Sequence, residues 1–366
     1  MQRYNKTICF FNSTIEWGGG EKWHFDMAYA MHKDGYNVLF FASPNSYLNE
    51  KLSKTNIKTI PVRISNLSFI NPAKIYYVKN KLIENDVDTI IMNQSSDLKA
   101  AGIAAKKAKI NRIIYRRGSA IPIRDTFFNR YLFKNIVTGI IANTNATKKT
   151  ILQNNTKLFD NEKIEVIYNG IDIYKLYAQE KKTFYKKTEN EFVIGNLGRL
   201  EKQKAQHHLL ELALELKKRK ARPFKIVIAG KGSLEANLKA KCKELNLCDV
   251  VVFTGFVNKV KGFYADLDIF ILTSIWEGFG YVIAEAMAFK KVVIAFNLSS
   301  NPEIIDNNKT GFLVKPGDIE AMADNVIKIM NDKDLQTEMT DKAFHKVKEN
   351  FTINIAYKKF IKYLHR

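Results

Sequence analysis

TSIWEGFGYVIAEAMA, residues 273–288, is the stretch that decides the interpretation of this chain. Two carboxylates, Glu277 and Glu285, bracket a Gly-aromatic-Gly turn that leads into an apolar pattern with helical spacing. The glycines at 278 and 280 let the backbone approach a ligand without an intervening side chain. The unpaired N–H groups of the first helical turn and the helix dipole can together receive a phosphate. The stretch therefore predicts a strand-to-helix loop that binds a sugar nucleotide.

The two carboxylates have a chemical use in such a loop. Glu285, one turn into the helix, can accept hydrogen bonds from vicinal hydroxyls, as the acidic residue of a dinucleotide fold does with ribose. Glu277 could do the same for a sugar. In an isolated pair at this spacing, the first acid more often complements the helix dipole and the second is a solvated surface residue. Whether this pair binds a ligand must therefore be judged from the neighbouring motifs.

Two further loops supply what a diphosphate needs. Gly198-Arg199-Leu200 follows an apolar strand and precedes Lys204, which places one guanidinium fork and one ammonium near a strand end. Gly230-Lys231-Gly232 follows another apolar run and turns directly into a helix. A lone Gly-x-Gly is weak evidence, because many strand-to-helix turns carry glycine.

Together these motifs resemble the retaining glycosyltransferases of family 4, the glycosyl transferases group 1. Their order and spacing are far more specific than any one of them. The resemblance implies an α/β fold of the GT-B type, with two facing Rossmann-like domains, parallel sheets and an interdomain cleft. The motifs that carry it are Asn169-Gly170-Ile171-Asp172, Gly198-Arg199-Leu200 with Lys204, Gly230-Lys231-Gly232, Phe253-Thr254-Gly255, Asp268, residues 277–285 and Gly311-Phe312-Leu313-Val314.

The resemblance also implies roles for single residues. Arg199 and Lys204 would neutralise the donor diphosphate, and Glu277 would touch the donor sugar; these three are the expected catalytic residues. Glu285 would hold the ribose hydroxyls. The remaining expected donor contacts are backbone and glycine positions: Gly19, Gly20, Gly230, Gly232, Phe279, Gly280 and Tyr281.

The sequence departs from the family pattern at two positions. Ala205 stands where a glycine commonly follows the lysine, and Lys290-Lys291 replace a Gly-x-Pro-like turn. Neither change removes a charged contact, but the first puts in doubt how closely the backbone approaches the phosphate.

The implied chemistry requires no cofactor and no metal. The leaving diphosphate is stabilised by cations and the helix N-terminus, and retention follows from attack on the face of departure, with the donor phosphate taking the acceptor proton. No Asp-x-Asp triplet has a plausible metal-holding role, and the adjacent pair His207-His208 is interpreted as a helix surface.

Length and alternation predict two domains. We expect an acceptor-side domain over residues 1–172, a lysine-rich linker over 173–190 and a donor-binding domain over 191–349, with a last helix at about 350–366 that packs back on the first domain. Strands are expected at 7–12, 38–42, 89–93, 112–115 and 139–142, and near Phe192, Lys225, Val250, Ile269 and Val292. Their alternation with helical patterns predicts parallel sheets.

The charge balance predicts an anionic partner. The chain has 58 Lys and Arg against 37 Asp and Glu, a net charge of +21. Residues 99–134 carry ten of these bases and one acid, Asp125, beside an aromatic stretch at 127–133 that either packs in the core or faces a membrane. We expect Arg116, Arg117 and Arg124 to meet an acidic acceptor, and this region to meet an anionic membrane surface. Two kinds of partner are expected. They are a nucleotide-sugar donor, with UDP the commoner choice, and a saccharide or lipid-linked acceptor of lipopolysaccharide or a related surface glycan.

Cysteine usage and hydropathy predict the location. Three cysteines without metal spacing indicate a reducing cytosol, and no run of about 18 apolar residues is present. We therefore expect a cytoplasmic protein that is peripheral on the inner face of the cytoplasmic membrane.

Three alternatives stay open at this point. A GT-B sugar-nucleotide epimerase would share the nucleotide site without needing an acceptor. A nucleic-acid-binding or nucleic-acid-glycosylating protein would suit the positive charge, but no nucleic-acid-binding motif is present and no such partner is expected. A noncatalytic sugar-nucleotide-binding module is disfavoured by the joint presence of Arg199, Lys204, Glu277 and Glu285.

Overall fold

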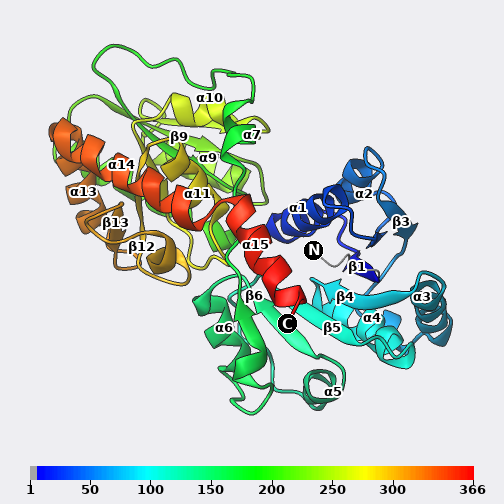
Figure 1. Cartoon of the computed structure of the whole chain (residues 1–366). Coiled ribbons are helices and arrows are strands. Elements are labelled where there is room, and N and C mark those ends of the chain that lie inside the picture. The colour runs from blue at the N-terminus through cyan, green and yellow to red at the C-terminus, as the bar shows by residue number, and fades with distance from the viewer. Residues whose placement is uncertain (1–5) are drawn as a thin grey trace. The chain divides into compact units, whose positions relative to one another are not determined.

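The protein divides into two compact units, each built around its own parallel sheet (Figure 1). The structure is a computed structural model that describes residues 6–366. The first unit contains the chain up to Tyr168 together with Tyr357–Arg366, and the second contains Asn169–Ala356. The prediction of two Rossmann-like α/β domains is confirmed.

The first unit has a seven-stranded sheet in the order β3-β2-β1-β4-β5-β6-β7. Its central strands are buried on both faces, which explains why their sequences are nearly continuous apolar runs. The strands are β1 (Thr7–Asn12), β2 (Val38–Ala42), β3 (Lys58–Pro61), β4 (Val87–Met92), β5 (Arg112–Arg117), β6 (Gly139–Ala142) and β7 (Ile164–Val166). All of the pairings between neighbouring strands are parallel.

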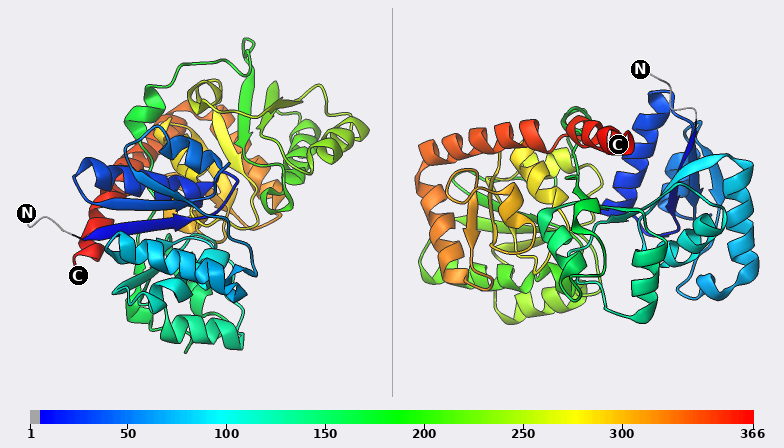
Figure 2. Two further views of the ribbon diagram at one scale, coloured as in Figure 1. Left: turned by 90° about the vertical axis from the view of Figure 1, so that its right-hand side faces the viewer. Right: turned by 60° about the horizontal axis from the view of Figure 1, so that its bottom comes forward.

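Six helices connect these strands. They are α1 (Gly19–Lys33), α2 (Tyr47–Leu52), α3 (Pro72–Glu84), α4 (Ser95–Lys107), α5 (Phe127–Asn135) and α6 (Asn145–Leu152). Figure 2 shows the chain in two further views. A short 3-10 turn, η1 (Ser68–Ile70), precedes α3. Side-chain oxygens of Ser46, Asn71, Thr126 and Thr144 cap four of these helices, since each accepts a hydrogen bond from a first-turn N–H group.

The second unit has a six-stranded sheet in the order β10-β9-β8-β11-β12-β13. The strands are β8 (Phe192–Leu197), β9 (Phe224–Ala229), β10 (Val251–Gly255), β11 (Ile269–Leu272), β12 (Val292–Phe296) and β13 (Phe312–Val314). The helices are α7 (Ile173–Tyr177), α8 (His207–Lys218), α9 (Glu235–Glu244), α10 (Val260–Ala265), α11 (Tyr281–Ala288), α12 (Asn301–Ile304), α13 (Ile319–Asn331) and α14 (Lys333–Asn350). Across residues 6–366, none of the helices combines the length and apolar character needed to span a bilayer.

Residues 173–190, expected as a linker, lie against the second unit. Tyr177 donates its hydroxyl to the Ala288 carbonyl, and Asp266 accepts from the backbone N–H groups of Phe184 (3.0 Å) and Tyr185 (3.3 Å). One tyrosine hydroxyl and two backbone N–H groups thus give this polar segment partners in the second unit that its lack of periodicity does not reveal. The first of the two points where the chain passes between the units lies at Tyr168 and Asn169.

The last helix, α15 (Ile353–Leu364), begins in the second unit and ends in the first. Within the first unit its Phe360 ring is fully buried and lies 5.2 Å from the Trp23 ring and 6.2 Å from the Phe10 ring. The apolar face of this helix therefore completes the core of the first unit.

Strand order identifies one reversal point in each sheet. In the first unit the chain moves outward from β1 in one direction and from β4 in the other, and β8 and β11 play the same parts in the second unit. Ligands of open parallel sheets bind beyond the carboxyl ends of the strands at such a reversal. The loops that follow β8 and β11 are therefore the first place to look for a site.

Candidate functional site

An ion pair joins the two loops at the reversal point of the second sheet. Lys204 lies after β8 and Glu277 after β11, 73 positions apart, and the Lys204 Nζ is 2.5 Å from the Glu277 Oε1. Both side chains are largely buried, 14% and 9% exposed. The structure thus brings together two of the residues that the sequence analysis assigns to one site.

Hydrogen bonds to backbone carbonyl groups hold these two loops side by side. The Thr273 hydroxyl donates to the Lys204 carbonyl at 2.9 Å, and the Ile275 N–H donates to the Gln203 carbonyl at 2.9 Å. The Gln203 amide nitrogen donates to the Trp276 carbonyl at 2.8 Å. The ion pair therefore sits on a backbone frame that is fixed without it.

The departure at position 205 has a conformational consequence. Ala205 is buried and adopts a left-handed conformation with φ of 46°, immediately after the short turn η3 (Lys202–Lys204). A glycine reaches this region without steric cost, whereas a methyl group makes it unfavourable. The backbone here keeps the conformation that a glycine would favour, despite the alanine.

The Gly230-Lys231-Gly232 loop lies directly on the loop that carries Arg199. Gly230 has φ of 142°, and a Cβ there would lie 1.8 Å from the Gly198 carbonyl oxygen. The Leu200 N–H donates to the Lys231 carbonyl at 2.9 Å. These glycines are required by close packing of two backbones, in addition to any contact with a ligand.

Gly280 sets the start of α11. It is the N-cap residue in a left-handed conformation, with φ of 80°, which glycine adopts without steric cost, and Tyr281 begins the helix directly after it. Phe279 before it is buried and packs against Phe351 at 5.7 Å. In the segment after β12, the hydroxyl of Ser299 donates to the Glu277 carbonyl at 2.6 Å. This hydrogen bond fixes the orientation of the Glu277 peptide group.

Glu285 has a partner that the sequence analysis does not predict. The hydroxyl of Tyr264 lies 3.3 Å from the Glu285 Oε2 and 3.2 Å from the Val282 carbonyl oxygen. Burial, with the Glu285 charge beside it, raises the pKa of Tyr264 well above its usual range. Tyr264 is therefore a permanent donor that can orient this carboxylate.

Arg199 differs from the other cation because its side chain is exposed at the end of β8. Its carbonyl accepts a hydrogen bond from the buried Gln206 amide at 2.9 Å. Neighbouring Glu201 accepts from the Ser233 N–H at 2.9 Å and from the Ser233 hydroxyl at 2.7 Å, and these bonds, aided by Arg199, lower the pKa of Glu201. Arg199 thus projects a charge from a firmly anchored backbone.

Two sets of possible metal ligands lie elsewhere in this unit. Asp266 and Asp268 precede β11, at the amino edge of the sheet, and Asp268 is paired with Lys187 at 2.6 Å. In the described part of the chain, one group of His and acidic residues has ligand atoms within 4.8 Å of one another, namely His207, His208 and Glu211 on α8. His208 already contacts Glu211 at 2.6 Å.

In the first unit, Glu21 ties the glycine segment to two strand ends. The buried Glu21 carboxylate accepts from Asn12 at 3.2 Å and from Asn93 at 3.4 Å, at the carboxyl ends of β1 and β4. A Cβ on Gly20 would lie 2.3 Å from the Asn93 amide nitrogen. Gly19 is exposed at the first position of α1. The reversal point of this sheet therefore also carries a polar cluster.

The three arginines expected to meet an acceptor lie in different environments. Arg116 is 1% exposed, with its guanidinium 5.1 Å from the Trp23 ring and 3.0 Å from the Asn93 side-chain oxygen. Arg117 donates to the Ile121 carbonyl at 2.6 Å and clamps the loop after β5. Arg124 is exposed. Their acceptor roles stay predictions. Arg116, in addition, packs inside the first unit against Trp23 and Asn93.

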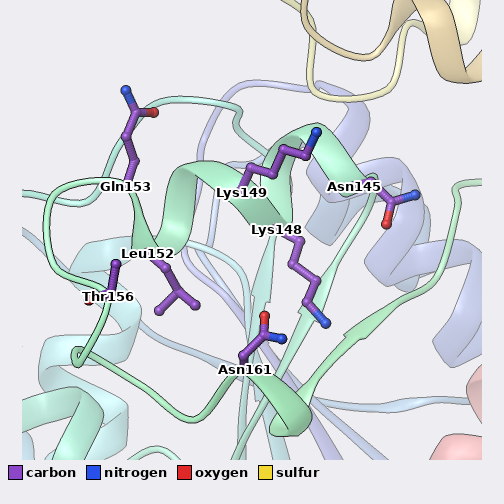
Figure 3. Close-up of a pocket in the computed structure, with 7 residues that line it drawn as sticks. All are labelled: Asn145, Lys148, Lys149, Leu152, Gln153, Thr156 and Asn161. Atoms are coloured by element: carbon purple, nitrogen blue, oxygen red, sulfur yellow. The ribbon is translucent and has the colours of Figure 1, made fainter.

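The first unit also has a hollow, whose lining residues are shown in Figure 3. It has a volume of about 480 Å³ and lies along α6. Its lining contains none of the predicted site residues and consists of Asn145, Lys148, Lys149, Leu152, Gln153, Thr156 and Asn161.

The ion pair leads to a prediction about stability. Replacing Lys204 by Met or Glu277 by Gln should each lower the free energy of unfolding by about 3 kcal/mol, because each leaves one buried group without its partner. The double variant should cost less than the sum of the two. Urea denaturation of the four proteins measures this coupling, and additive effects would contradict a direct interaction.

Asp97 in the first unit gives a pH prediction. It is fully buried and accepts from the Ser13 N–H at 3.2 Å, and burial raises the pKa of its carboxyl to about 7. Between about pH 4 and pH 7 the folded protein therefore keeps a proton that the unfolded chain releases, so stability falls as pH rises. Wild type should lose about 2–3 kcal/mol more than Asp97→Asn between pH 5 and pH 8. Equal losses in urea denaturation would show that Asp97 is ionised when folded.

Comparison with known proteins gives one consistent result. Residues 17–175 match the family described as Glycosyltransferase Family 4, and residues 178–346 match the family described as Glycosyl transferases group 1. The chain is 27% identical over 344 residues to an uncharacterized glycosyltransferase of Haemophilus influenzae, covering 92% of this chain and 94% of that protein.

Two further similarities concern named proteins. The chain is 27% identical over 310 residues to the UDP-Gal:alpha-D-GlcNAc-diphosphoundecaprenol alpha-1,3-galactosyltransferase of Escherichia coli, covering 80% and 79% of the two chains. The solved structure of HepE from Anabaena in complex with UDP and glucose matches with a TM-score of 0.81 and 22% identity, covering 98% and 99%. That likeness shows the GT-B fold. The chain belongs to the group 1 glycosyltransferases of family 4 and is a glycosyltransferase.

Proposed function

We propose that the protein is a retaining, metal-independent glycosyltransferase that moves a sugar from a UDP-sugar to a saccharide or lipid-linked acceptor of a cell-surface glycan. The observation that carries the proposal is the group of Arg199, Lys204 and Glu277 at the reversal point of the second sheet, beside the N-terminus of α11. Two cations and a helix N-terminus suit a leaving diphosphate.

The choice of UDP is supported by two relatives. HepE was solved with UDP, and the Escherichia coli relative is named for a UDP-sugar. In the present chain, Glu285 is the residue assigned to the ribose. Its contact with Tyr264 occupies one carboxylate oxygen with a fixed donor, which would hold the carboxylate in one orientation for two adjacent hydroxyls.

Transfer would depend on charge stabilisation at the diphosphate. Arg199 projects into solvent and would fold onto the phosphates when the donor arrives. Lys204 would exchange part of its contact with Glu277 for a phosphate oxygen, which would leave the Glu277 carboxylate available to a sugar hydroxyl. The acceptor would attack on the face from which the diphosphate departs, and the departing phosphate would take its proton. No protein nucleophile is needed on this route.

Metal independence is supported by the way this site supplies charge. Both positive groups are side chains already held at the sheet edge, whereas the Asp266-x-Asp268 triplet lies at the opposite edge. Its members accept hydrogen bonds from Phe184 and Val193, at 3.0 and 2.7 Å. These aspartates have structural partners that a metal would have to displace.

The acceptor is proposed to be a lipid-linked or phosphorylated saccharide. The Escherichia coli relative is named for a diphosphoundecaprenol substrate, and the net charge of +21 favours an acidic partner. We place the enzyme in the cytoplasm, peripheral on the inner face of the cytoplasmic membrane. Gly19 and Gly20 remain predicted donor contacts, and Arg116, Arg117 and Arg124 remain predicted acceptor contacts.

Loss of either diphosphate cation should be the most damaging change to catalysis. Arg199→Ala or Lys204→Ala should lower the transfer rate by about 10²–10³, because each removes a preorganised donor to the leaving group. The rate can be followed as UDP released from UDP-sugars in the presence of a bacterial lipid extract, with EDTA throughout. Transfer that stops in EDTA and returns with Mg²⁺ would contradict metal independence.

The matched control is Lys202→Ala, which removes an exposed lysine from the same loop. It should keep the wild-type rate. If Lys202→Ala and Lys204→Ala have equal rates while both proteins remain folded, the diphosphate assignment is wrong.

The ribose role of Glu285 can be tested without an acceptor. Glu285→Gln should weaken UDP binding by about tenfold in calorimetry, since a charge-assisted hydrogen bond contributes about 1.5 kcal/mol or more. Wild type should also prefer UDP over 2′-deoxy-UDP, and this preference should shrink in the variant. Glu320→Gln, an exposed position on α13, is the control. An unchanged preference would exclude contact with the 2′-hydroxyl.

A further inference from the structure

The aromatic stretch at 127–133 divides into a buried side and an exposed side. Leu132 and Phe133 are buried in the core of the first unit, whereas Phe127 is 88% exposed and Tyr131, one turn later on α5, is 45% exposed. Residues four apart lie on the same face of a helix. Helix α5 therefore presents an aromatic pair to solvent.

A second exposed apolar segment lies against the same helix. The loop after β3 leads into η1, where Leu67 and Ile70 are 66% and 65% exposed. Between them, the Phe69 ring packs against the Phe128 ring of α5 with centroids 4.7 Å apart. The contact between these two rings holds the exposed pair on η1 close to the exposed pair on α5. We call Leu67, Ile70, Phe127 and Tyr131 the edge patch.

The surroundings of the edge patch are basic. The segment at residues 61–75, from the end of β3 to the first turn of α3, contains Arg63 and Lys74 and no acid, and Lys99 lies 5.8 Å from the Phe69 ring. Arg124 is exposed just before α5. The local acid, Asp125, is bound by Arg130 through two hydrogen bonds of 2.8 and 2.6 Å, and this contact lowers its pKa to about 2.

The position of the edge patch in the fold is informative. Its two parts follow the carboxyl ends of β3 and β5, which lie at the edge of the sheet that carries the Glu21 cluster. In open parallel sheets this is the edge where ligands bind. The apolar surface of the edge patch therefore lies on the side of the first unit where a ligand would bind.

We propose that the edge patch docks the protein on an anionic lipid bilayer, with Leu67, Ile70, Phe127 and Tyr131 in the headgroup layer and Arg63, Lys99 and Arg124 at the lipid phosphates. Exposed aliphatic and aromatic side chains beside lysine and arginine are what such an interface requires. Nucleic acid would engage the cations but would leave Leu67 and Ile70 in water. The link from docking to a lipid-linked acceptor rests on the proposed function, whereas the docking itself does not.

Vesicle binding tests the proposal on the full-length protein without donor or acceptor. The wild type should sediment with phosphatidylglycerol vesicles and far less with phosphatidylcholine vesicles. The double variant Leu67→Ser with Phe127→Ser should lower the partition coefficient on phosphatidylglycerol at least tenfold, because two large apolar side chains leave the interface. Arg124→Gln should lower it about fivefold.

Matched controls come from the second unit. Tyr174→Ser with Phe256→Ser removes two aromatic side chains that are 85% and 69% exposed, and Lys309→Gln removes an exposed cation. These variants should bind as the wild type does. The proposal is overturned if the wild type ignores anionic vesicles, if the edge-patch double variant binds normally, or if the control double variant loses as much.

Two additional readouts separate the possible failures. Thermal stabilisation by UDP should be the same in the wild type and the edge-patch double variant, because none of the residues assigned to the donor belongs to the edge patch. Patch-dependent vesicle binding without UDP stabilisation would keep the docking surface and remove the donor proposal. Patch-dependent dimerisation in solution, with no vesicle binding, would assign the patch to a second copy of this chain and overturn the membrane proposal.

Discussion

Close contact between two backbones underlies the candidate donor site. Gly230 lies so near Gly198 that a single added Cβ would overlap the Gly198 carbonyl oxygen. The loop after β9 thereby supports the loop after β8, which carries Arg199 and leads to Lys204. Hydrogen bonds from Thr273, Ile275 and Gln203, together with the ion pair to Glu277, then connect this support to the loop after β11. A substitution at Gly230 would consequently disturb three loops, because each is positioned by the one before it.

The two units carry different polar groups at the reversal points of their sheets. In the second unit, a lysine and a glutamate meet at the reversal point of the sheet. In the first unit, Glu21 is held by the amides of Asn12 and Asn93, and Asn93 in turn accepts from Arg116. Buried polar groups of this kind are costly unless they are paired, so such a cluster is retained when it fixes a loop or meets a ligand. Gly20 packed against Asn93 shows that loop positioning is at least one of its tasks.

Much of the fold could be predicted because its central strands are continuous apolar runs. The strands at residues 7–12, 38–42 and 139–142 have the boundaries that the sequence indicates. The sequence analysis does not predict β3 and β7, because Lys58–Pro61 and Ile164–Val166 are short edge strands of mixed polarity. The proximity of Lys204 to Glu277 could be expected from the motif order. The contact of Tyr264 with Glu285 could not, because an aromatic residue in an apolar helix carries no sign of a polar partner. The burial of Arg116 depends likewise on Trp23, a residue 93 positions away.

Trp276, whose carbonyl accepts a hydrogen bond from Gln203, lies where a fluorescent reporter would be useful. The chain contains three tryptophans, and Trp17 and Trp23 both belong to the first unit. Trp276 is adjacent to Glu277 and is half-buried in the loop after β11. With phenylalanine at the other two positions, its indole would be the single tryptophan fluorophore of the chain, beside the proposed donor site. Emission from that one side chain would report the local polarity of the second unit without any attached label.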